Sequence, residues 1–189
     1  KRQLRQNVRD FQARKARLET PYTKSSAKQY KYKTMDLDPA RPLKVINQQI
    51  YDWAAKAGFP PDFFRESYFD QVTLSCLPDH ADCNFSRFNN CTFAVCRIYD
   101  ARFDGASLFN SEFHSCAIDH TTFFHATLAD THFYDCGMAW LSFQQARLAR
   151  CNFTDCAMDS VNFLLSTLDG CCAGPVSYTH LTLPTTSRV

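Results

Sequence analysis

The sequence predicts an all-β solenoid in which a short coil with four sides repeats along one axis. From residue 88 to residue 168, every fifth residue is large and apolar, seventeen in succession. The other 68 positions of residues 86–170 hold only five residues of type Phe, Leu, Ile or Met. Two places before each large residue, the side chain is small at nearly every row. Because a period of five fits neither an α-helix nor a flat strand, we predict a chain that turns after every five residues.

A second period, of twenty residues, shows how many sides close one coil. Large residues spaced by twenty are of closely similar kind: Phe93, Phe113, Phe133 and Phe153; Ile98, Ile118, Met138 and Met158; Phe103, Phe123, Phe143 and Phe163; Leu108, Leu128, Leu148 and Leu168. Since four rows of five make twenty, four sides close a coil, and stacked coils place like above like. Each buried Phe or Leu contributes about 1.5–3 kcal/mol, so these columns can hold the solenoid together.

The five-residue rows resemble the repeats of the pentapeptide-repeat family, whose consensus is A-(D/N)-L-x-x with Leu or Phe at the centre. ARFDG (101–105), CNFTD (151–155) and VNFLL (161–165) match this consensus, and the resemblance covers residues 86–170. It implies a right-handed quadrilateral β-helix, which we assign to residues 86–174. It also raises a DNA-mimic hypothesis, because some members of the family occupy the DNA groove of DNA gyrase with an acidic, rod-shaped surface.

The cysteines follow the same period. Six of them lie at the small inward positions of two neighbouring sides: Cys96, Cys116, Cys136 and Cys156, and, on the preceding side, Cys91 and Cys151. One hypothesis is a thiol ladder for metal or redox chemistry. We favour small buried apolar side chains, because parallel stacked Cβ vectors suit neither a tetrahedral metal site nor a disulfide. We therefore predict no metal and no cofactor, and the lack of CxxC spacing favours a reducing, cytoplasmic compartment.

Residues 1–85 precede the regular repeat and fall into three predicted segments. Residues 1–34 carry eleven Lys and Arg against two acidic residues, and we predict a basic helical arm and linker. Such an arm either binds a nucleic-acid backbone or is a solvated helix that leads from an upstream domain. We predict an amphipathic helical cap over residues 35–66 and a degenerate first coil over residues 67–85.

The predicted cap contains a helix over residues 40–57. Its apolar face has five members: Leu43, Ile46, Ile50, Trp53 and Ala57. The alternatives are a partner-binding helix and a helix that covers the open end of the solenoid; we favour the second, because an uncovered end exposes apolar side chains and strand edges. In the first coil, we place CNF (83–85) three residues out of frame and predict that LPDHAD (77–82) is an inserted turn.

The C-terminal residues leave the repeat after Gly170. VSYTHLTLPTT (176–186) resembles the translation of a sequencing adapter. We therefore expect residues 175–189 to be a non-native tail, and the chain to be a fragment truncated at both ends.

The outer surface of the repeat contains two candidate interaction surfaces, one acidic and one apolar. Together they have eight residues: Asp119, Asp135, Asp155, Asp159, Phe124, Trp140, Leu164 and Leu165. Residues 86–170 hold nine acidic residues and five Arg, so the acidic surface is interrupted by positive charge. His114 and His132 lie on one side of the solenoid without a third ligand at matching spacing, and we interpret them as surface histidines. Exposed apolar patches of this kind mark interfaces or are covered by further parts of the chain.

These patterns favour a non-catalytic, bacterial-type interaction module that presents a rod-shaped surface to a protein partner. No glycine-rich nucleotide motif occurs and a filled solenoid has no interior pocket, so we predict that the chain is not an enzyme. One alternative is a DNA mimic that binds a topoisomerase, namely gyrase; another is a recognition or targeting domain of a larger effector or enzyme. Dimerisation stays open. No run of eighteen apolar residues occurs, and we predict no membrane span.

Overall fold

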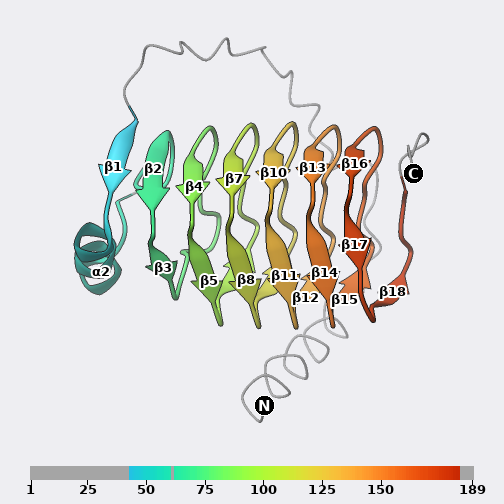
Figure 1. Ribbon diagram of the computed structural model, residues 1–189. Coiled ribbons are helices and arrows are strands. Elements are labelled where there is room, and N and C mark those ends of the chain that lie inside the picture. The colour runs from blue at the N-terminus through green and yellow to red at the C-terminus, as the bar shows by residue number, and fades with distance from the viewer. Residues whose placement is uncertain (1–42, 61, 184–189) are drawn as a thin grey trace, which may run out of the picture. The chain divides into compact units, whose positions relative to one another are not determined.

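A computed structural model describes residues 43–60 and 62–183 (Figure 1). All the described residues belong to one compact unit. The predicted basic arm and linker over residues 1–34 therefore lie outside the described residues, as do residues 35–42 of the predicted cap. The described unit is a parallel β-solenoid.

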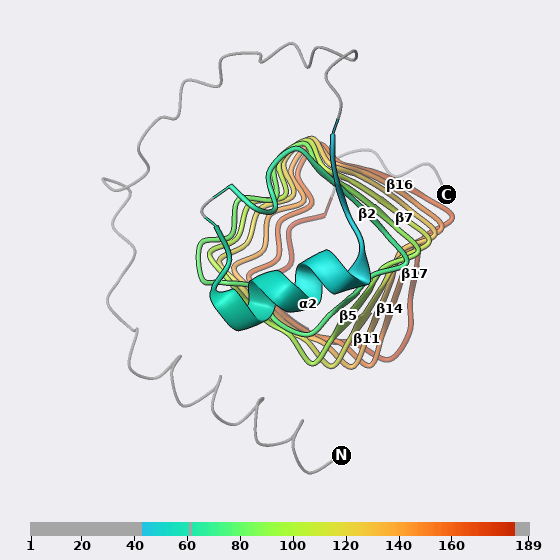
Figure 2. The ribbon, with the colours of Figure 1, turned by 90° about the vertical axis from the view of Figure 1, so that its left-hand side faces the viewer.

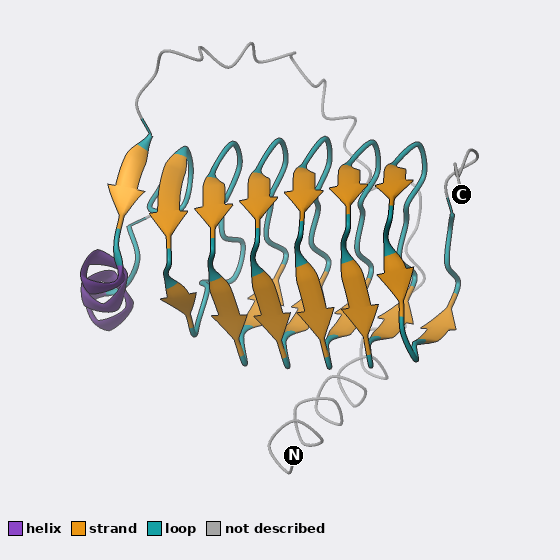
Figure 3. Cartoon of the chain, in the orientation of Figure 1, coloured by secondary structure: helices purple, strands orange, loops and turns teal. Residues whose placement is uncertain are grey.

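Three parallel sheets form three sides of the solenoid (Figure 3). The first sheet contains, in spatial order, β1 (Lys44–Ile46), β2 (Ser67–Asp70), β4 (Arg87–Asn89), β7 (Ser107–Phe109), β10 (Thr127–Ala129), β13 (Arg147–Ala149) and β16 (Thr167–Asp169). The second contains β3 (Thr73–Leu74), β5 (Thr92–Ala94), β8 (Glu112–His114), β11 (His132–Tyr134), β14 (Asn152–Thr154) and β17 (Cys172–Ala173). The third contains β6 (Arg97–Tyr99), β9 (Ala117–Asp119), β12 (Gly137–Ala139), β15 (Ala157–Asp159) and β18 (Ser177–Thr179).

The fourth side is held by single bridges instead of a sheet. The bridged residues are Asp82, Arg102, Thr122, Ser142, Asn162 and Thr182. Each lies twenty residues after the one before, so the period of twenty is the length of one coil. Figure 2 looks along the axis and shows the coils superposed one behind another. The predicted four-sided β-solenoid is confirmed.

Side chains complete the hydrogen bonding of the fourth side. The backbone N–H of Asp104 donates to Asn84 Oδ1 on the preceding coil (2.9 Å), and that of Phe124 donates to Asp104 Oδ1 (3.1 Å). Farther along the solenoid the acceptor lies on the same coil as the donor: the Leu164 N–H donates to Asn162 Oδ1 (2.8 Å). Polar residues on this side therefore satisfy backbone groups that no continuous strand pairs.

A residue in the left-handed backbone region stands at every corner of the repeat. Between Asn90 and Gly170, φ at every fifth residue lies between 48° and 66°. Most of these residues are Asn, Asp, Gly, Ser or His, which tolerate this conformation or adopt it more often than other types. Val95, Trp140 and Leu165 are exceptions, since β-branched and bulky side chains disfavour it. The corner column is a sequence signal that the five-residue period alone does not explain.

The interior consists of stacked rings. In one column the ring centroids of Phe113 and Phe133 lie 4.6 Å apart, and those of Phe133 and Phe153 lie 4.9 Å apart. In another, Phe123 and Phe143 are 4.9 Å apart, and rings of the two columns meet edge to face, as Phe133 and Phe143 do at 6.4 Å. All the large residues predicted to point inward from residue 88 to residue 163 are buried. The assignment of inside and outside by the period of five is confirmed.

The cap differs from its predicted form. The helix α2 (Gln48–Ala57) begins after Asn47, whose side chain accepts from the Ile50 N–H (2.9 Å), and the residues before it form β1. The buried helix residues are Tyr51 and Ala54. Of the predicted apolar face, Ile46 is buried, although it lies on β1. The prediction was wrong for the helix itself, because Ile50 is 40% exposed and Trp53 is 66% exposed.

The helix α2 nevertheless lies across one end of the solenoid, as Figure 2 shows. The Tyr51 hydroxyl accepts from the N–H groups of Ser75 and Cys76 (both 2.9 Å) and donates to the Cys76 carbonyl (2.8 Å). Burial raises the pKa of Tyr51 to about 12. Because the Tyr51 hydroxyl bonds to three backbone groups, the helix turns its Tyr51 side inward. The side that apolar periodicity predicts as buried therefore faces outward.

The first coil is also more regular than predicted. The backbone N–H of Cys83 donates to the Arg102 carbonyl on the next coil, and Cys83 is fully buried. CNF (83–85) is therefore in frame with residues 103–105 of the fourth side. Cys83 occupies the inward position that holds a large apolar residue in the later coils, while Phe85 lies at the corner and contacts Gly105. LPDHAD (77–82) is not an insertion. Leu74 pairs with Phe93, 19 residues later in the sequence, whereas Asp82 pairs with Arg102, 20 residues later. The first coil therefore has one residue fewer than the next coil between these two pairs.

The last coil extends the sheets beyond the predicted end of the repeat. The strand β17 pairs with β14, and β18 pairs with β15, in the same parallel register as the coils before. Both the inward and the outward side chains of this last coil are largely exposed to solvent; Tyr178, for example, is 61% exposed. That residues 175–189 are non-native stays a prediction.

Candidate interaction surface

The inward cysteines donate weak hydrogen bonds as well as filling space. Cys116 Sγ lies 3.3 Å from the Phe93 carbonyl oxygen of the preceding coil, and Cys136 Sγ lies 3.4 Å from that of Phe113. Thr131 Oγ1 occupies the equivalent position on another side and donates to a carbonyl in the same way. Burial raises the pKa of Cys91 to about 11, so this thiol stays protonated at neutral pH. The small inward position thus holds Cys, Thr or Ser with one short donor at many rows, and buried Ala at others, such as Ala106 and Ala126.

The acidic candidates form two separate pairs. Asp135 and Asp155 stand at one corner on adjacent coils, and both are exposed. Asp119 on β9 and Asp159 on β15 share a column with Ala139 between them, because each pairs in register with that residue of β12. The structure brings Asp135 beside Asp155, and it separates Asp119 from Asp159 by one coil.

The apolar candidates do not gather into one patch. Phe124 and Leu164 are half-buried residues of the fourth side, with one coil between them. Trp140 is 50% exposed at the corner before that side, and Leu165 is 56% exposed at the corner after it. The Phe124 ring packs edge-on against the His125 ring at 4.2 Å.

An aromatic column that the sequence analysis did not identify runs along the corner of Trp140. The rings of His80, Tyr99, His120 and Trp140 follow one another over four coils, with successive centroids 6.1, 5.8 and 6.1 Å apart. His120 Nδ1 lies 2.6 Å from Asp119 Oδ1, and this hydrogen bond raises the pKa of His120. The signal was available in the sequence, since Tyr99, Asp119, His120 and Trp140 fall in neighbouring outward columns.

The two histidines of the second sheet have different surroundings. His114 Nε2 lies 2.7 Å from Glu112 Oε2, and the His114 ring stacks on Tyr134 at 4.9 Å. His132 Nδ1 is buried without a hydrogen-bond partner among the described residues. Within residues 43–60 and 62–183, no group of three His, Cys, Asp or Glu is arranged to hold a metal ion.

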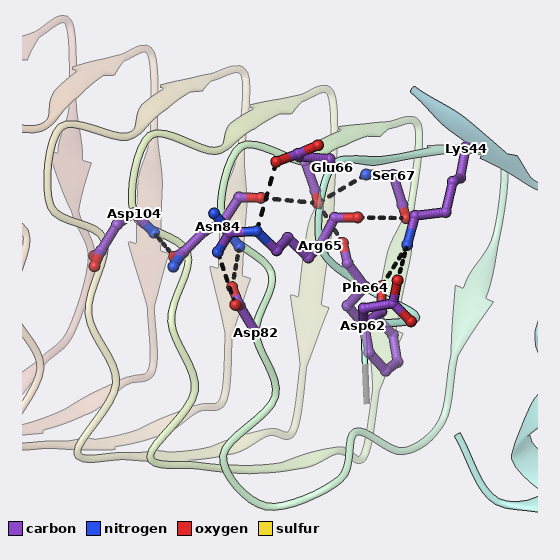
Figure 4. A network of polar contacts seen from close by, with 10 residues as sticks. Lys44, Asp62, Phe64, Arg65, Glu66, Ser67, Asp82, Asn84 and Asp104 are labelled. Carbon is purple, nitrogen blue, oxygen red and sulfur yellow. Dashed lines mark hydrogen bonds and ion pairs between the residues drawn. The ribbon is translucent and has the colours of Figure 1, made fainter. Parts of the chain in front are cut away.

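A polar network joins the cap to the first coils (Figure 4). Lys44 Nζ contacts Asp62 Oδ2 at 3.1 Å, and the Arg65 guanidinium donates to Asp82 Oδ2 at 2.9 Å. Burial raises the pKa of Asp104, which accepts from Thr122 and Phe124 on the next coil. The members of this network are engaged with one another and link β1 and residues 62–65 to the first coils.

Comparison with known proteins agrees with this architecture. Residues 86–163 match the family model described as a pentapeptide repeat region. Those residues are therefore a pentapeptide repeat region. Comparison with curated protein sequences gives no match.

Three solved structures of repeat proteins show low overall similarity. HetL, from the cyanobacterium Nostoc, is 12% identical, with a TM-score of 0.24 over 60% of this chain and 77% of its own. QnrB1, a plasmid-mediated fluoroquinolone resistance protein, is 12% identical, with a TM-score of 0.29 over 62% and 73%. Rfr23, from the cyanobacterium Cyanothece, is 7% identical, with a TM-score of 0.22 over 59% and 86%. Similarity of this extent carries no information on what the chain binds.

Proposed function

We propose that the chain is a non-catalytic interaction module that presents its outer surface to a protein partner. The observation that carries this proposal is the division between inside and outside. Large inward residues recur in kind from coil to coil and are buried as stacked rings, whereas outward columns mix Asp, Arg, His, Tyr and Trp. Because function is carried by sites on a fold and not by the fold itself, the varied outward columns are where specificity for a partner would lie. The same proposal includes a cytoplasmic location, and it leaves open whether the chain forms a dimer.

A photo-crosslinking scan tests the proposal. A photoreactive amino acid replaces one outward residue on each side of the solenoid: Thr127, Thr154, Ala157 and Gln144. In an extract of the cells that make the protein, we expect one or two of these faces to give a discrete protein adduct. Equal capture from all four faces, or none, would contradict an interaction module.

A DNA mimic that acts on a topoisomerase is the second candidate, and Asp135 with Asp155 supports it. Both carboxylates are exposed on adjacent coils, as a mimic of phosphate charge requires. Against it, Arg150 forms a bidentate pair with Asp130 at 2.6 Å on a neighbouring corner and neutralises that carboxylate. The test is a gyrase supercoiling assay with the double variant Asp135→Lys and Asp155→Lys. Inhibition by the unmodified chain that this variant abolishes supports mimicry, and no inhibition by either removes it.

A recognition or targeting domain of a larger effector or enzyme is the third candidate. The same crosslinking scan applies to it, because such a domain also needs one recognition face. Among the described residues, no helix has the length and apolar composition needed to cross a bilayer.

A further inference from the structure

On the third side, the first coil meets the repeat without a partner strand. Among the described residues, the third sheet ends at β6, which pairs with β9 and with no strand of the first coil. Residues 77–81 of the first coil lie against β6, where the His80 N–H donates to the Tyr99 carbonyl (2.9 Å). Because a sheet ladder is absent here, side-chain contacts have a larger share in joining the two coils.

Two side-chain pairs join this segment to the next coil. Asp79 lies 3.5 Å from the Arg97 guanidinium, which also lies over the Tyr99 ring, 5.2 Å from its centre. His80 Nδ1 lies 2.8 Å from Asp100 Oδ2. The arginine is charged at every physiological pH, whereas the histidine pair is an ion pair only while the imidazole is protonated. One of the two contacts therefore depends on pH.

Asp100 stands between two histidines of the same corner. His80, Asp100 and His120 follow one another at intervals of twenty residues, and all three have positive φ, so they occupy one corner on successive coils. His120 Nδ1 lies 2.6 Å from Asp119 Oδ1. The hydrogen bond to Asp119 raises the pKa of His120, and the negative charges of Asp119 and Asp100 raise it further. Carboxylates therefore face both imidazoles.

The remaining neighbours of the two histidines do not change this balance. Asp82, two residues after His80, is paired with Arg65 at 2.9 Å. On the coil after His120, Ala139 and Trp140 carry no charge. The charges that act on this corner are therefore those of the two histidines, their carboxylate partners and the neighbouring arginine pair.

We infer that His80, Asp100, His120 and Asp119 form a pH-dependent clamp, which holds residues 77–82 to the next two coils while its histidines are charged. A protonated imidazole donates a charge-assisted hydrogen bond to a carboxylate, whereas the neutral ring keeps only a weaker one. Because the folded-state pKa of His120 is raised, its contribution is complete below about pH 6.5 and is lost as the pH rises through that raised pKa. The inference goes beyond the proposed function and does not depend on it.

Hydrogen exchange of the full chain, followed by mass spectrometry, measures the clamp. The protection of residues 77–82, corrected for the intrinsic pH dependence of exchange, is compared at about pH 5.5 and about pH 8. We expect it to fall about two- to fivefold at the higher pH. The loss is modest because both side chains of the His80–Asp100 pair are exposed and solvent screens them. Residues 147–154 are the internal reference, and a pH dependence at residues 77–82 no larger than theirs would overturn the inference.

Three substitutions by asparagine locate the effect, because asparagine tolerates the left-handed conformation at each of these corners. His80→Asn and Asp100→Asn should each remove the pH dependence at residues 77–82, since each deletes one charge of the pair. His125→Asn is the matched control, because His125 is an exposed corner histidine of another side whose ring packs on Phe124. This control should keep the pH dependence. Its loss in the control, or its survival in either of the other variants, would rule out the clamp.

An NMR titration tests whether His120 belongs to the same clamp. Asp119→Asn should lower the pKa of His120, because it replaces the carboxylate that accepts the hydrogen bond. Asp100→Asn should lower it less, since Asp100 acts on His120 through its charge alone. A pKa of His120 that stays unchanged in Asp100→Asn would show that the two histidines do not share this carboxylate, and would contradict the clamp.

Discussion

The repeat coils and the capped first coil are stabilised by different kinds of contact. In the repeat, like rings stack on like, as Phe113, Phe133 and Phe153 do at 4.6 and 4.9 Å. Each coil therefore stabilises its neighbours through the same contacts, which is the nearest-neighbour energetics of a repeat protein. At the cap, single side chains have unique partners, such as the Tyr51 hydroxyl with three backbone groups of residues 75 and 76.

The difference teaches where each part of the chain is vulnerable. A column with several equivalent rings distributes its stabilisation, yet loss of a central ring removes contacts above and below. The end of the solenoid has no such redundancy, because the first coil pairs with only one regular coil. Four substitutions test this contrast, from the largest expected effect to the smallest.

Phe133→Ala should be the most damaging change. The ring is fully buried between Phe113 and Phe153, and we expect it to lower the free energy of unfolding by ~3–5 kcal/mol. Denaturant unfolding measures the loss, and outward Thr154→Ala is the control, expected to lie within about 0.5 kcal/mol of the unmodified chain. Equal losses in the two variants would mean that inside and outside have been assigned incorrectly.

Tyr51→Phe should have an intermediate effect that is confined to the cap. Removal of the hydroxyl leaves the N–H groups of Ser75 and Cys76 without their acceptor, which costs on the order of 1–3 kcal/mol. Hydrogen exchange should show faster exchange at those two amides, with amides of the central coils unchanged. Uniform acceleration along the whole solenoid would show that the cap and the repeat unfold as one unit.

Cys136→Ala should cost about 1 kcal/mol, for a small cavity and a lost weak hydrogen bond to the Phe113 carbonyl. Cys136→Ser should cost less, because its hydroxyl keeps a donor at the position that Thr131 occupies on another side. Thermal unfolding with and without a metal chelator measures both variants. Zinc retained through purification, or a large chelator-induced shift of the melting temperature, would restore the thiol-ladder hypothesis.

Val95→Asn should increase stability by about 0.5 kcal/mol, the smallest of the four effects. Val95 is 54% exposed with φ at 56°, so its substitution loses little burial and relieves a disfavoured conformation. Val95→Ala is the matched control, since alanine loses the same apolar contacts without favouring the left-handed region. A gain in the alanine variant equal to that in the asparagine variant would attribute the effect to side-chain contacts instead of backbone conformation.

The interior columns could be predicted from sequence because a buried column requires one residue type at a fixed interval. The five-residue period placed Phe93 and Phe163 inward, and the twenty-residue period fixed the number of sides. Asp135 and Asp155 were placed side by side for the same reason. The periods determine both the inward columns and which outward residues share a column.

The cap face could not be predicted in this way. Apolar periodicity pointed to Ile50 and Trp53, yet Tyr51 and Ala54 are buried. The deciding interaction is long-range, between one hydroxyl and the backbone of residues 75 and 76, and no local pattern contains it. The frame of CNF (83–85) was also predicted incorrectly. The chain has one residue fewer between Leu74 and Asp82 than between their partners Phe93 and Arg102, and only the pairing of the coils shows where this residue is missing.

The sequence by itself determined the four-sided solenoid and its inward columns, because hydrophobic burial acts on every coil with the same geometry. Tertiary structure alone decided which face of α2 turns inward, and how corner and sheet residues of different columns meet. His120 lies within hydrogen-bond distance of Asp119 and near Trp140 only because the left-handed corner directs successive side chains around the turn. Periodicity fixes the height and side of each residue, and backbone conformation at the corners fixes the directions in which outward side chains point.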